Sequence, residues 1–194
     1  MTDQPSLIDI EPPALPEGFC YEPDFLDREE ERALVTAIKG LPFKPFEFHG
    51  FEGKRRVVSF GWRYDFKEAK LREAPPIPDF LHAAGAKAAR FAELHAHALE
   101  QLLVTEYHPG APIGWHIDRP IFADVIGVSL LASCTFRFRR KSGGAWARAS
   151  LMLEPGSVYL LRGPARTAWE HSIPPVEKLR YSLTFRTFRK KARP

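Results

Sequence analysis

A histidine and an aspartate two positions apart, His116 and Asp118, are the residues that most directly suggest chemistry. In an extended segment, residues i and i+2 point to the same side of the chain, so both side chains can reach one metal ion. The pair follows the turn signal Pro109-Gly110, at the start of a region rich in strand-forming residues. This spacing predicts a metal site that a further ligand must complete; the alternative is a surface histidine near a surface aspartate.

A late histidine, His171, is the candidate for the third ligand, because it lies in the alternating segment 169–173. Two imidazoles and one carboxylate leave three positions of a non-haem Fe(II) ion open, two for a chelating 2-oxo acid and one for dioxygen. The remaining histidines are better explained as residues of loops or helix surfaces; they are His49, His82, His95, His97 and His108.

The strand candidate that follows has a polar face with two arginines. Arg180, Ser182, Thr184 and Arg186 alternate with Tyr181, Leu183 and Phe185, and the apolar set belongs in a core. If the polar face meets solvent, it needs no functional explanation. If it lines the inside of a barrel, the guanidinium groups form a clamp for a dicarboxylate, because arginine matches a carboxylate through two hydrogen bonds.

The elements that must position these residues change in character at about residue 100. Residues 1–18 contain four prolines and are expected to form an irregular arm. A helix is predicted from Asp27 to Gly40, with Glu30 completing a capping box, and a second helix from Asp79 to Leu99. Residues 55–66 between the helices alternate like a strand, with Phe60, Trp62, Tyr64 and Phe66 on one side.

Eight short strand candidates fill the rest of the chain, separated by Pro and Gly turn signals: 101–107, 112–117, 125–131, 134–140, 149–153, 157–161, 167–173 and 179–188. This density of strands indicates an antiparallel sandwich or barrel. The predicted fold class is α+β, a C-terminal β-sandwich supported by N-terminal helices.

Length and composition suit one ordinary globular domain of 194 residues, with 44% hydrophobic and 27% charged residues. No stretch of 18 apolar residues predicts a membrane span, and the N-terminus lacks a signal-peptide pattern, so we expect a cytoplasmic protein. We also expect it to be a monomer. Cys20 and Cys134 are far apart and are expected to be reduced thiols. The net charge of +4 permits an anionic partner such as nucleic acid.

Several segments, in order, resemble the AlkB-type Fe(II)- and 2-oxoglutarate-dependent dioxygenases. The motifs that carry the resemblance are Thr105-Glu106-Tyr107-His108-Pro109-Gly110, Trp115-His116-Ile117-Asp118, Val128-Ser129-Leu130 with Phe136-Arg137-Phe138, Trp169-Glu170-His171-Ser172-Ile173 after Gly163 and Arg166, and Arg180-Tyr181-Ser182-Leu183-Thr184-Phe185-Arg186. Together they cover residues 101–188. The resemblance implies a double-stranded β-helix, or jelly roll, within a single domain 1–194.

The resemblance also implies roles for individual residues. His116, Asp118 and His171 match the ligands of Fe(II). Tyr107 and Arg180 match residues that hold the distal carboxylate of 2-oxoglutarate, and Arg186 matches one near its oxalyl end; Thr105 and Ser182 stand where the family often has Asn, and both can still hydrogen-bond. The implied reaction couples decarboxylation of 2-oxoglutarate to hydroxylation of an N-methyl group, which then leaves as formaldehyde.

The family's typical substrates are methylated bases in DNA or RNA, presented in a single strand or flipped out of a duplex. Residues 43–70 resemble its nucleotide-recognition lid, where Phe60, Trp62 and Tyr64 would stack a base and Arg56, with Lys54, Arg55 and Arg63, would meet phosphates. The alternative is that these aromatic residues are the core face of a strand.

Arg119 departs from the family pattern. Many repair enzymes have an acidic residue just after the metal-binding aspartate, and a guanidinium cannot accept a hydrogen bond from a base amine. This leaves open another base, an RNA or a protein side chain as substrate. Two further alternatives are an oxygenase that acts on a small molecule and a non-catalytic binding module on the same fold.

Overall fold

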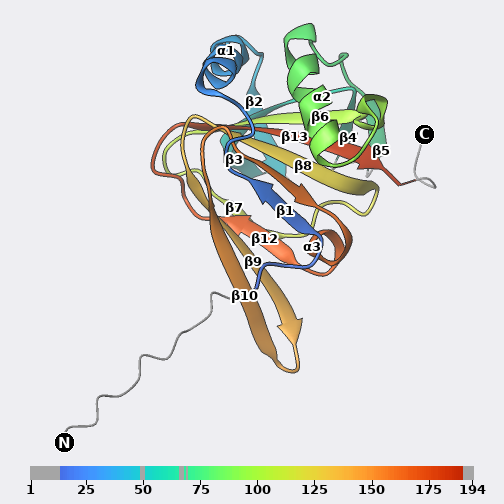
Figure 1. The fold of residues 1–194 in the computed structure, drawn as a ribbon, viewed down its shortest axis with the longest axis vertical. Helices are drawn as coiled ribbons and strands as arrows, with labels where there is room; N and C mark the ends of the chain where they lie inside the picture. The colour runs from blue at the N-terminus through green and yellow to red at the C-terminus, as the bar shows by residue number, and fades with distance from the viewer. Residues whose placement is uncertain (1–13, 49–50, 66–67, 69, 190–194) are drawn as a thin grey trace, which may run out of the picture.

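The computed structural model describes residues 14–48, 51–65, 68 and 70–189 (Figure 1). Its strands are β1 (Phe19–Glu22), β2 (Lys44–Phe48), β3 (Phe51–Phe60), β4 (Trp62–Asp65), β5 (Lys70–Glu73), β6 (Gln101–Tyr107), β7 (Ile113–His116), β8 (Phe122–Leu130), β9 (Cys134–Ser142), β10 (Ala145–Leu153), β11 (Val158–Leu161), β12 (Glu170–Ile173) and β13 (Arg180–Phe188). Its helices are α1 (Arg28–Ile38), α2 (His82–Phe91) and α3 (Gly163–Thr167), with short 3-10 turns η1 (Asp79–Leu81) and η2 (Ala96–Ala98).

Two antiparallel sheets build the jelly roll. The major sheet has seven strands in the order β1-β11-β8-β13-β6-β3-β2, and the minor sheet has four in the order β10-β9-β12-β7. Strands that are distant in sequence are neighbours in both sheets, as expected for this fold. The predicted fold class, a double-stranded β-helix with supporting N-terminal helices, is confirmed.

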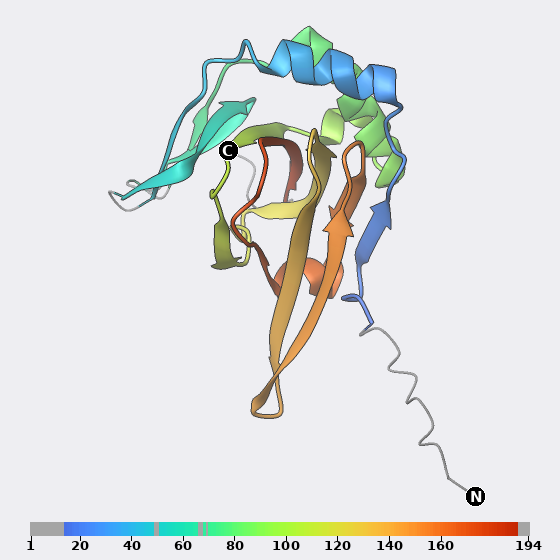
Figure 2. The ribbon, with the colours of Figure 1, turned by 90° about the vertical axis from the view of Figure 1, so that its left-hand side faces the viewer.

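Helices α1 and α2 lie over the major sheet, away from the minor sheet (Figure 2). Helix α1 begins with the predicted capping box, in which the Asp27 side chain accepts from the backbone and Glu30 reaches back to the Asp27 N–H. Its apolar face buries Leu34, Val35 and Ile38 in the core cluster beneath the helices. No described helix is both long and apolar enough to cross a membrane.

The second predicted helix is wrong in length. Helix α2 covers only His82–Phe91, and the chain leaves it at Glu93, whose φ of 55° is left-handed. In the turn before α2, Leu81 is fully buried, whereas Phe80 is 37% exposed. The strand predicted at 167–173 is also shorter than expected, because Gly163–Thr167 forms α3 and only Glu170–Ile173 is extended.

The strand predicted over 55–66 is divided at Gly61. This residue has a φ of 71°, and a Cβ there would lie 2.2 Å from the carbonyl oxygen of Glu100, so only glycine fits. Before it, β3 pairs with β6 inside the major sheet; after it, β4 pairs with β5 in a separate hairpin. Part of the segment expected to act as a lid is therefore a strand of the main sheet, and Phe66 lies outside the described residues.

A second core cluster lies between the two sheets. It contains the inward-facing side chains of β9, β10 and β11, among them Phe136, Phe138 and Leu153. Gly127 on β8 makes room for Tyr159 on β11, since a Cβ on this glycine would meet the Tyr159 ring at 2.1 Å.

Candidate active site

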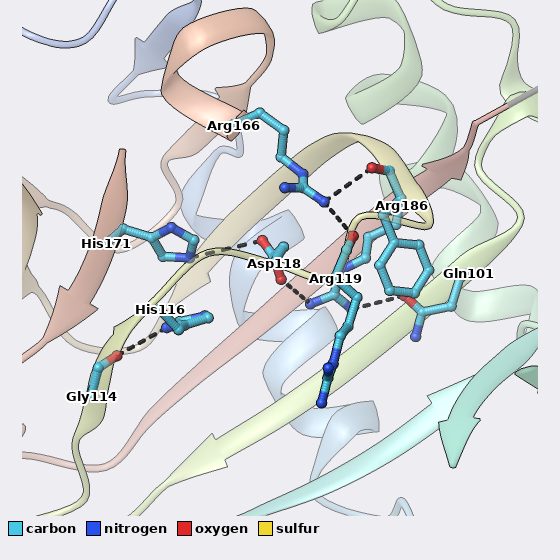
Figure 3. Close-up of polar contacts among 9 residues, drawn as sticks. Gln101, Gly114, His116, Asp118, Arg119, Arg166, His171 and Arg186 are labelled. Carbon is cyan, nitrogen blue, oxygen red and sulfur yellow. Dashed lines mark hydrogen bonds and ion pairs between the residues drawn. The ribbon is translucent and has the colours of Figure 1, made fainter. Parts of the chain in front are cut away.

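Two neighbouring strands of the minor sheet bring the predicted histidines together. Strands β7 and β12 are antiparallel, with His116 directly opposite His171, and their ring centroids are 4.2 Å apart. Asp118 follows the end of β7, and its Oδ2 lies 3.8 Å from His171 Nε2 (Figure 3). Three side chains separated by up to 55 positions therefore share one small region at the inner face of the sheet.

The hydrogen bond of His116 fixes which of its nitrogens is available. Its Nδ1 lies 2.9 Å from the carbonyl oxygen of Gly114, which can only accept, so Nδ1 carries the proton and Nε2 has a lone pair for a metal. Within the described part of the chain, no three His, Cys, Asp or Glu side chains are positioned so that they could hold a metal ion as they stand. The site is preassembled in part, with His171 and Asp118 facing each other and His116 packed alongside.

The electrostatics favour the protonation states that a metal needs. Burial by itself would raise the pKa of Asp118, but Arg186, whose Nη2 lies 3.2 Å from Oδ1, and the two imidazoles lower it well below its usual range. Burial and the neighbouring His116 lower the pKa of His171 to about 3. A carboxylate and a neutral imidazole are the forms that ligate metal ions.

A cavity of about 1740 Å³ opens between the sheets over these residues. The polar face of β13 lines it rather than meeting solvent, through Arg180, Ser182, Thr184 and Arg186, and β6 adds Gln101, Thr105 and Tyr107. Register places Arg180 beside Tyr107 and Ser182 beside Thr105. The polar face of β13 could have met either solvent or the inside of a barrel, and in the structure it lies inside the barrel.

The most buried cationic side chain among the described residues of the cavity is Arg180, which is 1% exposed. Its Nε donates to Ser129 Oγ at 3.1 Å, and its guanidinium carbon lies 4.9 Å from the Tyr107 ring centroid. Its Nη1 is buried without a hydrogen-bond partner among the described residues. A buried cation with an unsatisfied donor is costly unless an anion meets it, so the site fits the carboxylate of a dicarboxylic acid.

Arg186 lies between that anion site and the candidate metal ligands. It donates to Gln101 Oε1 at 2.8 Å as well as to Asp118, while its buried Nε has no partner in the described part of the chain. Behind it, Arg166 donates to the carbonyl oxygens of Arg119 and Phe122, which ties down the chain that follows Asp118 (Figure 3).

The residues expected to meet a substrate divide into two groups. Tyr64 and Arg119 line the cavity, and the Arg119 guanidinium lies 4.9 Å from the Tyr64 ring centroid. Phe60 touches the cavity wall, but it is only 5% exposed and belongs to the core cluster beneath the helices. This agrees with the alternative that the aromatic residue belongs to the core face of a strand.

Two residues that were expected to meet a substrate, Arg56 and Trp62, lie away from this cavity. Arg56 is paired with Glu106 at 2.6 Å and does not line the cavity. Trp62 packs edge-on against Phe188 and does not line it either. For Arg56 the cause is the alternation of β3: Arg55, whose pairing partner is the cavity-lining Tyr107, is on the cavity face, which puts Arg56 on the opposite face.

Several residues of the cavity were not predicted. Tyr159 is buried beside the polar groups, and burial raises the pKa of its hydroxyl above the usual range, so it stays protonated. Arg55, which was expected to meet phosphates, lines the cavity from β3, and burial there lowers the pKa of its guanidinium. Gln101 and Ser129 were missed because their importance depends on pairing with Arg186 and Arg180 across strands, which only the sheet register reveals.

The jelly roll, the histidine–carboxylate group and the buried anion site together define the metal- and 2-oxo-acid-dependent oxygenase class. The family model of the 2OG-Fe(II) oxygenase superfamily matches residues 18–186, so the chain belongs to this superfamily, and its relatives place it with the AlkB-type members, which use Fe(II) and 2-oxoglutarate.

Three of the similar proteins show how much of each chain is shared. The chain is 31% identical over 183 residues to the Alkylated DNA repair protein ALKBH8 homolog of Arabidopsis thaliana, covering 81% of this chain and 51% of that protein. It is 28% identical over 176 residues to tRNA (carboxymethyluridine(34)-5-O)-methyltransferase alkbh8 of Xenopus tropicalis, covering 84% and 26%. It therefore spans between a quarter and a half of these two proteins. An uncharacterized protein L905 of Acanthamoeba polyphaga mimivirus is 30% identical, with 87% and 84% covered.

Solved structures agree on the fold. That of OsALKBH1 superposes with a TM-score of 0.64 at 18% identity, covering 90% of this chain and 98% of that one. A Pseudomonas putida prolyl-4-hydroxylase superposes with a TM-score of 0.61 at 15% identity, covering 89% and 93%. The two similar structures have different names but share the fold, so the fold alone does not identify the substrate.

Proposed function

We propose that this chain is an oxidative demethylase of alkylated nucleobases in DNA or RNA, with Fe(II) held by His116, Asp118 and His171. The observation that carries the proposal is the conjunction of this group with the unsatisfied guanidinium of Arg180 inside one cavity. Binding of the ion would complete a ligand set that is already partly assembled. Bound iron and 2-oxoglutarate would supply the oxidising chemistry, and the protein supplies position and protection from water.

Each side chain of the cavity has a role in this proposal. Arg180, with Tyr107 beside it, holds the distal carboxylate, since its Nη1 is the buried donor that needs an anion. Arg186 keeps Asp118 ionised and orients it through the 3.2 Å contact. Thr105 and Ser182, adjacent on β6 and β13, offer hydroxyl groups along the same wall.

Nucleic acid is proposed as the substrate because of what surrounds the opening. Tyr64 presents an aromatic ring at the cavity, and Arg55, Arg63 and Arg119 place cationic groups there. Aromatic rings stack bases and guanidinium groups contact phosphates. Relatives whose names refer to DNA repair and to tRNA point the same way.

A second candidate is an oxygenase that acts on a protein side chain or a small molecule. The observation that favours it is the stacking of Arg119 on Tyr64, because it places a cation where a base would need an aromatic face. An acidic group on the substrate would suit this arrangement.

The two candidates are separated by following substrate and cosubstrate in the same tubes. The protein is incubated in air with Fe(II), ascorbate and 2-oxoglutarate, together with single-stranded oligonucleotides carrying different methylated bases or with methyl-lysine peptides. Equal amounts of succinate and formaldehyde, with loss of a methyl group from an oligonucleotide, support the nucleobase demethylase. Turnover of peptides alone selects the second candidate and refutes the first.

A further inference from the structure

The outer face of the minor sheet has an unusual composition that the cavity does not explain. Strands β9 and β10 form a long hairpin that projects beyond the rest of the sheet, on the side away from α1 and α2 (Figures 1 and 2). Because Phe136 and Phe138 of β9 are buried between the sheets, the alternate residues of β9 face outward. These outward residues are Arg137, Arg139 and Lys141.

Two tryptophans, one on β10 next to β9 and one on β7 beyond β12, interleave with these cations. Arg139 lies between two indoles, with its guanidinium carbon 4.5 Å from the ring centroid of Trp115 on β7 and 4.5 Å from that of Trp146 on β10. Arg137 lies 5.0 Å from Trp115, and Lys141 lies 5.6 Å from Trp146. We call these five residues the cation–indole ladder.

The charge of this face is mainly positive. Arg148, which is exposed, lies opposite Arg139 in the β9–β10 register and adds a fourth cation to those of the ladder. Glu170 on β12 pairs with Arg139 at 2.6 Å and balances only one of them. The excess is large for a chain whose whole net charge is +4, so a polyanion would be attracted to this face.

The ladder is continuous with the candidate active site. Trp115 belongs to the ladder and also lines the cavity, and the next residue, His116, points inward to the candidate metal site. A chain bound along β9 and β10 would therefore lead to the cavity edge. The spacing of cations and aromatic rings suits a partner that carries phosphates and flat bases alternately, rather than an acidic peptide.

We propose that the cation–indole ladder, with Arg148, is a docking surface for single-stranded nucleic acid that guides the strand to the cavity. The inference deepens the proposed function and rests on it for its biological purpose, but binding to the ladder can be measured without any turnover. Phosphates contact the cations, bases stack on the indoles, and the hairpin extends the bound length well beyond the one nucleotide that enters the site.

The first test uses the full chain and an unmethylated, fluorescein-labelled single-stranded RNA of about 20 nucleotides, with affinity read by fluorescence anisotropy over a range of salt concentrations. Lys141→Gln with Arg148→Gln should lower the salt dependence (the slope of log K against log salt) by about 1.4, at about 0.7 for each phosphate that is no longer neutralised. The matched control is Arg28→Gln with Arg32→Gln, which removes two exposed charges from α1. An unchanged slope, or the same change in the control, overturns the proposal.

A second variant separates docking from simple stability of the hairpin. Trp146→Ala should weaken RNA binding about tenfold, as expected for loss of one stacked base. Its melting temperature is measured in parallel, and Trp146→Phe should restore binding because it keeps an aromatic face. If Trp146→Phe binds as weakly as Trp146→Ala while remaining folded, the indole does not stack a base and the ladder is structural only.

Failure of the ladder and failure of the proposed function give different results. A methylated trinucleotide is too short to span the hairpin, so the Lys141→Gln, Arg148→Gln variant should demethylate it at the parental rate. If the ladder variants lose RNA binding but no methylated oligonucleotide is ever turned over, the surface stands and the proposed function fails. If methylated oligonucleotides are turned over but the ladder variants bind as the parent does, the function stands and the surface fails.

Discussion

Replacement of Arg180 by methionine tests the anion site most sharply. The arginine is 1% exposed, and its Nη1 has no partner among the described residues, so the folded apoprotein contains a poorly compensated buried charge. Methionine has a similar shape without the charge, and such replacements of buried ions are often neutral or stabilising. We therefore expect Arg180→Met to melt at or above the temperature of the parent in the absence of cosubstrate.

The magnitude of the binding defect follows from the hydrogen bonds at stake. Charge-assisted hydrogen bonds contribute about 1.5–3 kcal/mol each, so removal of the carboxylate's partner should raise the Kd for 2-oxoglutarate by roughly 150-fold or more, taking about 3 kcal/mol. In the parent, 2-oxoglutarate at about 100 times Kd adds about 2.7 kcal/mol of stability, which is roughly 5–10 °C in a domain of this size. Arg180→Met should lose that shift.

The assay is thermal unfolding with Mn(II) in place of Fe(II), across a titration of 2-oxoglutarate. Ser129→Ala serves as the graded control, since it removes only the partner of Arg180 Nε and should weaken binding by much less. Metal binding, measured without cosubstrate, should be the same in all three proteins. A folded Arg180→Met variant with the parental 2-oxoglutarate shift would refute the assignment of the anion site.

Three further outcomes are expected. Asp118→Ala should abolish metal binding, measured by equilibrium dialysis, because it removes the carboxylate that faces His171; retention of one bound metal would contradict this. Gly61→Ala should lower the melting temperature by several degrees, since its φ is positive and a Cβ would meet Glu100, whereas Gly114→Ala, with open space around it, should change little. Burial alone would raise the pKa of Glu106, but the hydrogen bonds from Arg56 and Tyr181 outweigh burial, so the pKa lies below its usual value. A group with a lowered folded-state pKa stabilises the fold above about pH 4.5 and loses that contribution as the pH falls, so Glu106→Gln should flatten the acid side of a stability–pH profile; an unchanged profile would count against the pairing.

The candidate metal ligands could be predicted because their signal is local. A histidine and an aspartate at i and i+2 share a side in any extended segment, and His171 lies in an alternating segment. The structure then places His116 opposite His171 across β7 and β12, which is a matter of register between segments 55 residues apart. The spacing of His116 and Asp118 could be interpreted from the sequence, whereas the pairing of β7 with β12, which brings His171 beside them, could not.

The sequence did not show which residues of the segment 55–66 face the cavity. Alternation shows which residues share a face but not which face meets the cavity. In β3 the face with Arg55 lines the cavity, while Arg56 lies on the other face and pairs with Glu106. The break at Gly61 then separates Trp62 from that alternation, and its cause, the close approach of Glu100, is a tertiary contact.

The helical prediction failed in a similar way. The alanine-rich run after Asp79 has high helix propensity, which indicated a helix to Leu99, but the chain turns at Glu93 so that Leu94 and Leu99 can pack on the main core cluster. Packing overrode propensity at the end of the helix, whereas the capping box at Asp27 fixed the start of α1 from local sequence alone.

The measurement that tests the central claim most directly is succinate release from 2-oxoglutarate in air, with Fe(II) and ascorbate, by the parent and by His171→Ala. The account predicts that the parent forms succinate, faster with a methylated single-stranded oligonucleotide and in step with formaldehyde, and that a folded His171→Ala variant forms none. Equal succinate from both proteins would contradict the assignment of the metal site, and with it the proposed function.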